Sequence, residues 1–283
     1  MMDLDAWVRT MGIRPGGTVL LMADVTRMAW SCRRAPQGFD VRMPLNACLA
    51  AVGAEGHVLV PTFNFDLRDG DRFDVLHTRS ISGALANAAL AHPRFRRTPH
   101  PLHSFAVAGP QAPVLSEHDH HGSFDEGSPF AFLHREAAQL VAIDLPLNDT
   151  LTFVHYVEQR EHVKYRRDRR IRIRYTDRHG ATLLRSYGIF AKRKGYVNDF
   201  RALEPKLAEA GAMTDHVLER HRARVIDLNA AMPVIEHDIR HNAARSIHYF
   251  SLRGWTTEVL KDLLRTFGLR TAKERLAHAA RIS

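Results

Sequence analysis

The sequence of 283 residues contains only two cysteines, Cys32 and Cys48. Neither cysteine has a partner at the spacing of a zinc site, so we predict free thiols in a reducing compartment. No run of about 18 apolar residues occurs, which argues against a membrane-spanning helix. The amino terminus carries acidic residues and lacks the apolar segment of a secretory signal. These absences together predict a cytoplasmic protein without a transmembrane segment.

Internal repeats and low-complexity segments are also missing. The hydrophobic fraction of 45% is ordinary for a globular protein, and we predict a single domain over residues 1–283. A shift to a more basic composition near residue 160 marks a weak internal boundary, and residues 251–283 are predicted to form a helical C-terminal extension. The net charge of +9 favours anionic partners such as nucleic acid, a membrane surface or a phosphate-bearing small molecule.

Short apolar runs that alternate with helical patterns predict an α/β fold. Residues 18–22 and 56–60 have the composition of buried strands, and residues 45–52 between them have that of a helix. A strand, a helix and a second strand in this order predict a parallel pair with a right-handed crossover. Residues 31–44 are predicted to be a loop. Further buried strands are expected at 105–108 and 138–145.

The second half of the chain is rich in arginine. Ile171 and Ile173 alternate with arginines, which predicts a strand with one wet face, and residues 181–187 complete a basic hairpin. Such a hairpin could bind nucleic acid, but it has no ladder of stacking aromatic residues, so we do not expect a nucleic-acid partner. The arginines of this hairpin are better explained as a solvated face or as the phosphate-binding wall of a pocket. Further elements are predicted as helices over 198–212, within 213–231 and over 255–267, and as a strand within 244–250.

Residues 148–158 contain the strongest candidate for chemistry. They follow the predicted strand 138–145, and open α/β sheets place their sites at the carboxyl ends of strands. If the segment is helical, Thr152, His155 and Glu158 share one face, because they are spaced three residues apart. An imidazole within reach of a carboxylate is the minimum for an oriented general base. Spacing alone equally allows a half-exposed helix with a satisfied histidine and a solvated glutamate.

Other polar clusters allow two interpretations each. Ser80 and Ser82 precede a predicted helix over 84–91, where a serine could cap the helix or the helix end could bind a phosphate. Gly127-Ser128-Pro129 is predicted to begin another helix. Residues 117–121, Glu-His-Asp-His-His, resemble metal ligands, but no matching pair lies at zinc spacing. We therefore expect an exposed loop there and no metal site.

Six sequence blocks, in order, resemble the aminoglycoside 3-N-acetyltransferase-like family, whose members are acyl-coenzyme A enzymes with a fold unrelated to that of the GNAT acetyltransferases. The resemblance extends over roughly residues 14–235 and combines blocks that are individually weak. The blocks are Gly17–Thr26, Val52–Phe63 with its Pro61-Thr62-Phe63, Ser80-x-x-Gly83, His100-Pro101-x-x-Ser104-Phe105, Gly127-Ser128-Pro129-Phe130 and Thr152-x-x-His155-x-x-Glu158.

The resemblance implies an α/β/α sandwich around a mixed sheet, with coenzyme A in a cleft beside it, here joined by the basic hairpin and the C-terminal helices. It implies that His155 is the general base and that Glu158 and Asp24 orient or support it. The implied coenzyme-binding residues are Thr26, Ser80, Ser82, Gly83, Ser104 and Ser128. The implied substrate-binding residues are His100, Asn148 and Thr152.

The implied reaction is the transfer of an acetyl or other short acyl group from acyl-coenzyme A to a small-molecule amine. A thioester is already activated, so direct attack in a ternary complex needs a base and no covalent nucleophile. A homodimer is compatible with the sequence.

The acceptor is the open point, because residues 31–44 differ from the pattern of the resistance enzymes. Aminoglycosides are polycations and favour acidic walls, whereas this chain is basic, so Coulomb attraction favours an anionic acceptor. A nucleotide-linked amino sugar for surface polysaccharide fits this requirement. The alternatives are an aminoglycoside 3-N-acetyltransferase that confers antibiotic resistance and, in another class, a basic nucleic-acid-binding protein.

Overall fold

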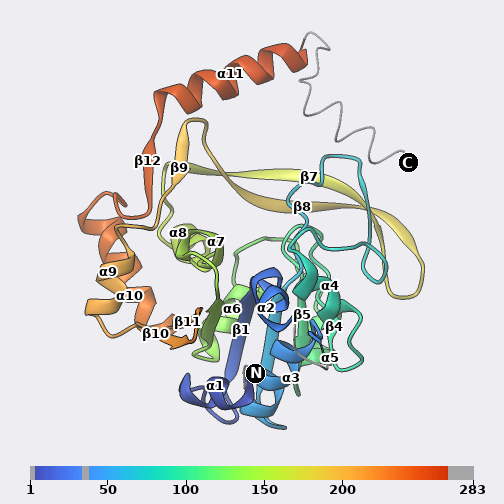
Figure 1. The fold of residues 1–283 in the computed structure, drawn as a ribbon. Helices are drawn as coiled ribbons and strands as arrows, with labels where there is room; N and C mark the ends of the chain where they lie inside the picture. Colours follow the sequence, from blue (N-terminus) through green and yellow to red (C-terminus); the bar gives the residue numbers. More distant parts are fainter. Residues whose placement is uncertain (1–3, 34–37, 267–283) are drawn as a thin grey trace.

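The computed structural model describes residues 4–33 and 38–266, and its main element is a seven-stranded sheet (Figure 1). The strand order is β10-β11-β6-β1-β2-β5-β4. The strands are β1 Thr18–Ala23, β2 His57–Pro61, β4 Arg96–Arg97, β5 Phe105–Ala108, β6 Gln139–Ile143, β10 Met213–Leu218 and β11 His221–Asp227.

The centre of this sheet is parallel and its edges are antiparallel. Strand β1 pairs in parallel with both β2 and β6, which confirms the predicted parallel pair. On one side β11 pairs antiparallel with β6, and β10 pairs antiparallel with β11. On the other side β5 pairs antiparallel with β2, and β4 pairs antiparallel with β5. The sheet is therefore mixed, as predicted. Helix α3, Met43–Val52, makes the crossover between β1 and β2.

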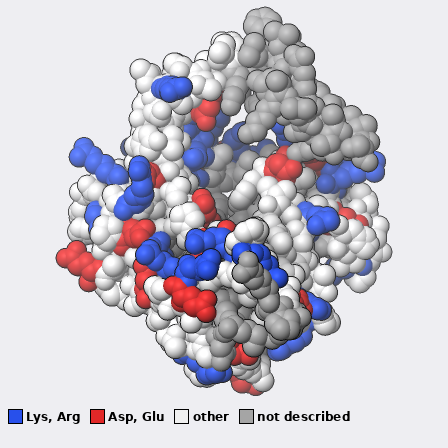
Figure 2. Space-filling model, viewed as in Figure 1, with Lys and Arg blue, Asp and Glu red and all other residues white. Residues whose placement is uncertain are grey.

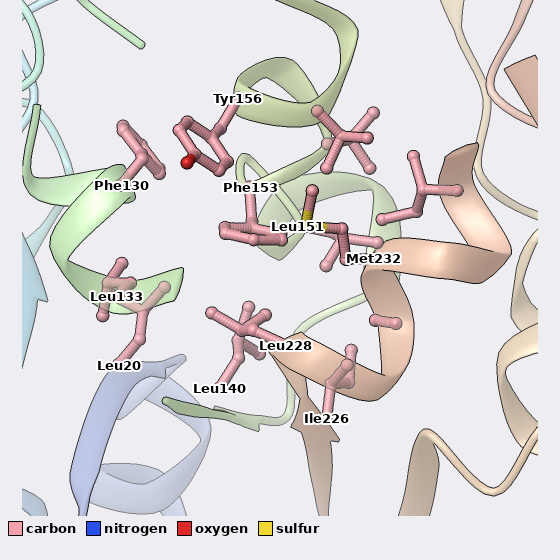
Figure 3. Close-up of a cluster of buried hydrophobic side chains, with 14 of the residues drawn as sticks. Leu20, Phe130, Leu133, Leu140, Leu151, Phe153, Tyr156, Ile226, Leu228 and Met232 are labelled. Atoms are coloured by element: carbon pink, nitrogen blue, oxygen red, sulfur yellow. The ribbon is translucent and has the colours of Figure 1, made fainter. Parts of the chain in front are cut away.

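Side chains of the central strands alternate between two hydrophobic cores, one on each face of the sheet. Leu20 of β1 packs into one core, and Val19 and Leu21 pack into the other. Figure 3 shows Leu20 in the first core with Phe130 and Met232. The helices that pack on the first face are α6 Pro129–Arg135, α7 Leu147–Thr150, α8 Val154–Arg160, α9 Glu204–Glu209 and α10 Leu228–His241. The helices that pack on the second face are α1 Leu4–Thr10, α2 Val25–Cys32, α3 and α4 Ala84–Leu90. The predicted α/β/α sandwich is confirmed.

A long hairpin crosses one end of the sandwich (Figure 1). Strand β7, Arg166–Thr176, pairs antiparallel with β8, Thr182–Lys192, and β3, Arg72–Asp74, adds a short parallel edge. The predicted basic hairpin is confirmed and extends further at its open end, to Arg166 and Lys192. It has a small core of its own that includes Phe73, Ile173 and Tyr187.

Three sequence-based assignments were wrong. Residues 213–227 form the β10–β11 hairpin, in which β11 pairs with β6 and β10 pairs with β11, and α10 then continues through Pro233. The predicted loop over 31–44 is shorter than expected, because its first two residues belong to α2 and its last two to α3. The helix predicted over 198–212 is reduced to α9.

The remaining elements lie near the carboxyl end. Strand β9, Tyr196–Asn198, pairs antiparallel with β12, His248–Phe250, and α11, Leu252–Thr266, follows. Helix α5, Ala112–Glu117, follows β5. Residues 267–283 of the predicted C-terminal extension lie outside the described residues. No helix within the described residues is long and apolar enough to cross a membrane.

Candidate active site

The segment after β6 forms two short helices, α7 and α8, where one helix was expected. The backbone of Leu151 has φ −83° and ψ 51°, which ends α7, and Thr152 lies in the turn before α8. Buried side chains of Leu151, Phe153 and Tyr156 anchor both helices to the core (Figure 3). His155 and Glu158 therefore share a helix face, as predicted, while Thr152 belongs to the preceding turn.

His155 and Glu158 are in direct contact. His155 Nδ1 lies 2.7 Å from Glu158 Oε2, and the two side chains are 14% and 0% exposed. The ionised carboxylate accepts only, so Nδ1 carries the proton and Nε2 keeps a lone pair. Nε2 has two longer contacts, 3.2 Å to Arg166 Nη2 and 3.4 Å to Asn198 Nδ2. This arrangement presents an imidazole nitrogen that can accept a proton.

The Glu158 carboxylate is buried and fully engaged. Arg166 Nε lies 2.5 Å from Oε2, and Tyr165 Oη donates to Oε1 at 2.9 Å. Burial raises the pKa of Glu158, but His155 and Arg166 outweigh it and hold the pKa below its usual value. A paired carboxylate of this kind stays ionised and fixes the ring of His155.

The electrostatics keep His155 neutral. Burial lowers the pKa of His155 and Arg166 lowers it further, which together exceed the raising effect of Glu158. A neutral imidazole at neutral pH is the form that a general base needs. The cluster of His155, Glu158, Arg166 and Tyr165 therefore combines a base with a group that orients it.

His155 lines a cavity of about 460 Å³ between α7–α8 and the end of β8. The polar lining also includes Asn148, Thr152, Lys192 and Asn198, and the apolar lining is formed by Phe65, Phe124, Ile189, Phe190 and Ala191. Figure 2 shows a hollow in one face of the molecule, with Lys and Arg side chains visible in it. The cavity is large enough for a small acceptor molecule.

A second cavity of about 370 Å³ adjoins the first. The two share Phe65, Asp149 and Thr152 as lining residues. The second cavity extends over the carboxyl ends of β1 and β2 to Ser82 and Gly83. The cleft therefore has two connected parts, one at His155 and one at the carboxyl ends of the parallel strands.

The predicted residues divide into those on the cleft and those away from it. His155, Asn148 and Thr152 line the first part, and Ser82 and Gly83 line the second. Ser82 Oγ accepts from Phe63 N at 3.0 Å, and the expected serine cap of α4 is replaced by Gly83 at the N-cap position. The Asn148 side chain accepts from Phe200 N at 2.9 Å, which ties α7 to the chain after β9.

Asp24 and Thr26 lie at the start of α2. The Asp24 carboxylate caps the helix by accepting from Thr26 N at 3.0 Å, and it is not part of the His155 cluster. Thr26 lines a different cavity, beside Trp30 and His221. The structure therefore does not bring the third predicted catalytic residue to the base.

Four further predicted residues are buried and bonded within the protein. Ser104 Oγ bonds to Thr62 and accepts from Arg97 Nε at 2.9 Å. Ser128 caps α6 by accepting from Ala131 N. Ser80 Oγ donates to the Phe63 carbonyl at 3.1 Å.

His100, the fourth of these residues, closes a tight turn. Its Nδ1 accepts from Leu102 N and His103 N at 3.2 and 3.1 Å. Burial, with the neighbouring histidines His103 and His120, holds the pKa of His100 well below its usual value. Its role in the geometry is to shape the chain that places His103 on the cavity wall.

Several residues of the site were missed by sequence reasoning. Arg166, Tyr165, Lys192 and Asn198 come from the hairpin, the residue before it and β9, and all lie outside the His155 motif in the chain. The arginine-rich run was noticed, but nothing in it distinguishes the buried Arg166 from its exposed neighbours. His103 stands in the His-Pro block and also lines the cavity, with Nδ1 buried and without a hydrogen-bond partner among the described residues.

Several solved structures with the same fold are described as aminoglycoside acetyltransferases. AAC-IIIb with CoASH superposes with a TM-score of 0.71 at 21% identity, covering 88% of this chain and 97% of that one. A mutant of AAC(3)-IVa in complex with apramycin gives 0.66 at 21% identity, covering 84% and 90%. A further structure with this fold, YokD from Bacillus subtilis, gives 0.66 at 17% identity, covering 86% and 93%. These similarities establish the fold.

The family follows from the sequence itself. The family model described as aminoglycoside 3-N-acetyltransferase matches residues 20–239. This range holds the parallel strands, the cleft, the His155–Glu158 pair and the hairpin. The chain therefore belongs to the aminoglycoside 3-N-acetyltransferase family and is, by class, an acyl-coenzyme A-dependent N-acetyltransferase.

Proposed function

We propose that this chain transfers an acetyl or short acyl group from acyl-coenzyme A to the amine of a sugar, with His155 as the general base. The main support for this proposal is the His155–Glu158 pair on the wall of the cleft. The amine nitrogen bonds to the thioester carbonyl carbon, one amine proton passes to His155 Nε2, and the C–S bond breaks. The departing thiolate takes up a proton and leaves as coenzyme A.

Glu158 has a positioning role in this scheme. It holds the proton on Nδ1, so that Nε2 is the nitrogen free to accept. It also stabilises the imidazolium that forms when Nε2 is protonated. Arg166 also contacts Oε2, and Tyr165 donates to Oε1, so both oxygens of the carboxylate are held in place.

The two-part cleft supports a ternary complex. The part at the edge of β1 and β2 would hold the end of the coenzyme, and the part at His155 would hold the acceptor. Coenzyme binding is also supported by the related fold of AAC-IIIb, which was solved with CoASH. Thr152 and Asp149, which line both parts, mark where the thioester and the amine would meet.

The charges on the acceptor part of the cleft bear on the substrate. Glu158 is neutralised by Arg166, and the wall carries the opposite charges of Asp149 and Lys192. A polycation would need a surplus of carboxylates, which these walls do not supply. The described walls therefore lack the surplus of carboxylates that a polycation needs, and Lys192 is available to pair with one negative group of the acceptor, as in a nucleotide-linked amino sugar.

A second candidate is acetylation of an aminoglycoside. It is supported by the family and by structural neighbours solved with sisomicin, apramycin and gentamicin. A nucleic-acid-binding role has weaker support, because Arg172 and Arg185 of the hairpin are paired with Asp69 and Asp119.

The test is thiol release from acetyl-coenzyme A with two acceptor panels, sugar nucleotides and aminoglycosides. We expect release with the sugar nucleotides and a loss of at least about 100-fold in kcat for His155→Ala. The matched control is His162→Asn, an exposed histidine two residues beyond α8. Release with aminoglycosides alone would replace the proposed acceptor, and full activity of His155→Ala would remove the proposed base.

A further inference from the structure

A second histidine of this chain lies between a serine and an aspartate. His221 Nε2 lies 2.8 Å from Ser31 Oγ, and His221 Nδ1 forms a short hydrogen bond with Asp144 Oδ2. The three residues come from the last turn of α2, the end of β6 and the start of β11. They are far apart in the sequence, and the sheet brings them together because β6 and β11 are neighbours.

The aspartate in this group is held firmly. The side chains of Asp144 and His221 are each 1% exposed. Asp144 Oδ1 accepts from Arg222 N at 3.0 Å, and Arg27 Nη1 approaches the same oxygen at 3.8 Å. The backbone of Asp144 has φ +57°, a conformation that L-residues adopt at a cost and that often marks functional positions.

The hydrogen bonds define the roles of the two ring nitrogens. The Asp144 carboxylate accepts the proton on Nδ1, which leaves Nε2 to accept from the Ser31 hydroxyl. A serine paired with a histidine that is oriented by a carboxylate is the arrangement that activates a hydroxyl as a nucleophile. It is recognised by geometry rather than by position in the sequence.

Ser31 and His221 also open onto a cavity. This cavity, of about 660 Å³, is largely apolar, and Trp30 and three arginines, Arg27, Arg33 and Arg220, line it with them. Among the described residues it shares none of its lining with the cleft at His155. The exposed Trp30 ring, with Arg33 stacked over it at 4.2 Å, offers an apolar and basic wall.

We propose that Ser31, His221 and Asp144 form a second catalytic site, which hydrolyses esters or thioesters of carboxylic acids that carry a negatively charged group. Ser31 Oγ would bond to the carbonyl carbon while its proton passes to His221 Nε2. The C–O or C–S bond then breaks, and the leaving group takes the proton from His221. Water repeats the sequence on the acyl-serine, which releases the carboxylic acid and restores the hydroxyl.

The cavity lining explains the substrate class. The three arginines attract an anionic substrate, and their N–H groups can stabilise the negative oxygen of the tetrahedral intermediate. The apolar part of the wall suits an acyl or aromatic group. Asp144 is a positioning residue, because it contacts His221 and not the reacting atoms.

The experiment uses the full chain and a fluorophosphonate probe, which loses fluoride when an activated serine attacks it. Mass spectrometry of the labelled protein should place the adduct on Ser31, and no variant is needed for this step. We expect Ser31→Ala to abolish the labelling and His221→Asn to slow it at least about 100-fold. The rate of p-nitrophenyl acetate hydrolysis should change in the same way, with no hydrolysis by Ser31→Ala and slow hydrolysis by His221→Asn.

Two controls separate this site from the transferase. Ser186→Ala, a partly buried serine of β8 outside all three cavities, should label at the wild-type rate. His155→Ala should also label at the wild-type rate while it loses thiol release with an amine, so that the two sites can fail independently. Absence of an adduct on Ser31 in the wild-type chain, or an adduct on another serine, would overturn the proposal and leave the three residues as a structural link between α2 and the sheet.

Discussion

Replacing Glu158 by glutamine removes one charge and almost no volume from the centre of the site. In the wild-type chain the carboxylate contacts His155 Nδ1 at 2.7 Å, Arg166 Nε at 2.5 Å and Tyr165 Oη at 2.9 Å. A glutamine oxygen at the position of Oε2 can keep the contacts with Nδ1 and Arg166 Nε but carries no charge, and its amide group then faces Tyr165 Oη. In the opposite orientation the amide group faces Nδ1, where it can only donate and favours the tautomer with the proton on Nε2.

The expected effects follow from these contacts. Arg166 would be left buried without its counter-charge, which costs about 3–5 kcal/mol of stability when one partner of a buried pair is removed. The rate should fall by about 10²- to 10⁴-fold, because glutamine has no charge to stabilise the imidazolium and, with its amide group toward Nδ1, leaves no lone pair on Nε2. Urea unfolding measures the first effect, and thiol release from acetyl-coenzyme A measures the second.

The matched control is Glu161→Gln, one helical turn further along. Glu161 pairs with Arg240 at 2.5 Å, but Arg240 is half exposed, so the loss should be about 1 kcal/mol or less and the rate should not change. A Glu158→Gln variant that stays folded with kcat within about threefold of wild type would refute the positioning role. A Glu158→Gln variant as stable as wild type would refute the buried ion pair.

Other residues of the cleft and the core allow four more tests. The kcat/KM of the transferase should fall at acid pH with an apparent pKa below 6.5, because burial and Arg166 lower the pKa of the base His155, and a pH profile measures this. Lys192→Glu should raise KM at least about tenfold for an anionic acceptor and not for a polycation, since it reverses a charge on the acceptor wall; equal KM values would contradict the charge argument. Burial, reinforced by His155, lowers the pKa of His103 to about 3, so the unfolded chain binds a proton that the folded chain does not between about pH 6.5 and 3. Stability should therefore fall as the pH falls through this window, by up to about 1.4 kcal/mol per unit, and His103→Asn should reduce the slope of unfolding free energy against pH. Ser128→Ala should cost about 1 kcal/mol as a lost helix cap and leave KM for acetyl-coenzyme A within about twofold; a large rise in KM would restore its predicted coenzyme role.

The sequence by itself determined the central strands, the basic hairpin and the His155–Glu158 pair. Runs such as Val58–Val60 are buried on both faces and are continuous in the sequence, so their strand character is visible locally. The three-residue spacing of His155 and Glu158 places them on one face of any helix, within reach of each other. The ordered blocks identified the family, because local backbone requirements and site residues are both encoded in short motifs.

The tertiary structure alone decided the pairing of residues 223–227 with β6, the turn at Thr152 and the identity of the buried arginine. Strand pairing over 223–227 depends on a partner far away in the chain, and local propensity was therefore misleading. Arg166 differs from Arg167 only in which face of β7 it occupies, and that face is set by the packing of the hairpin against α8. The meeting of Ser31, Asp144 and His221 has the same origin. Contacts between distant segments are products of topology, and a one-dimensional pattern contains no distance between them.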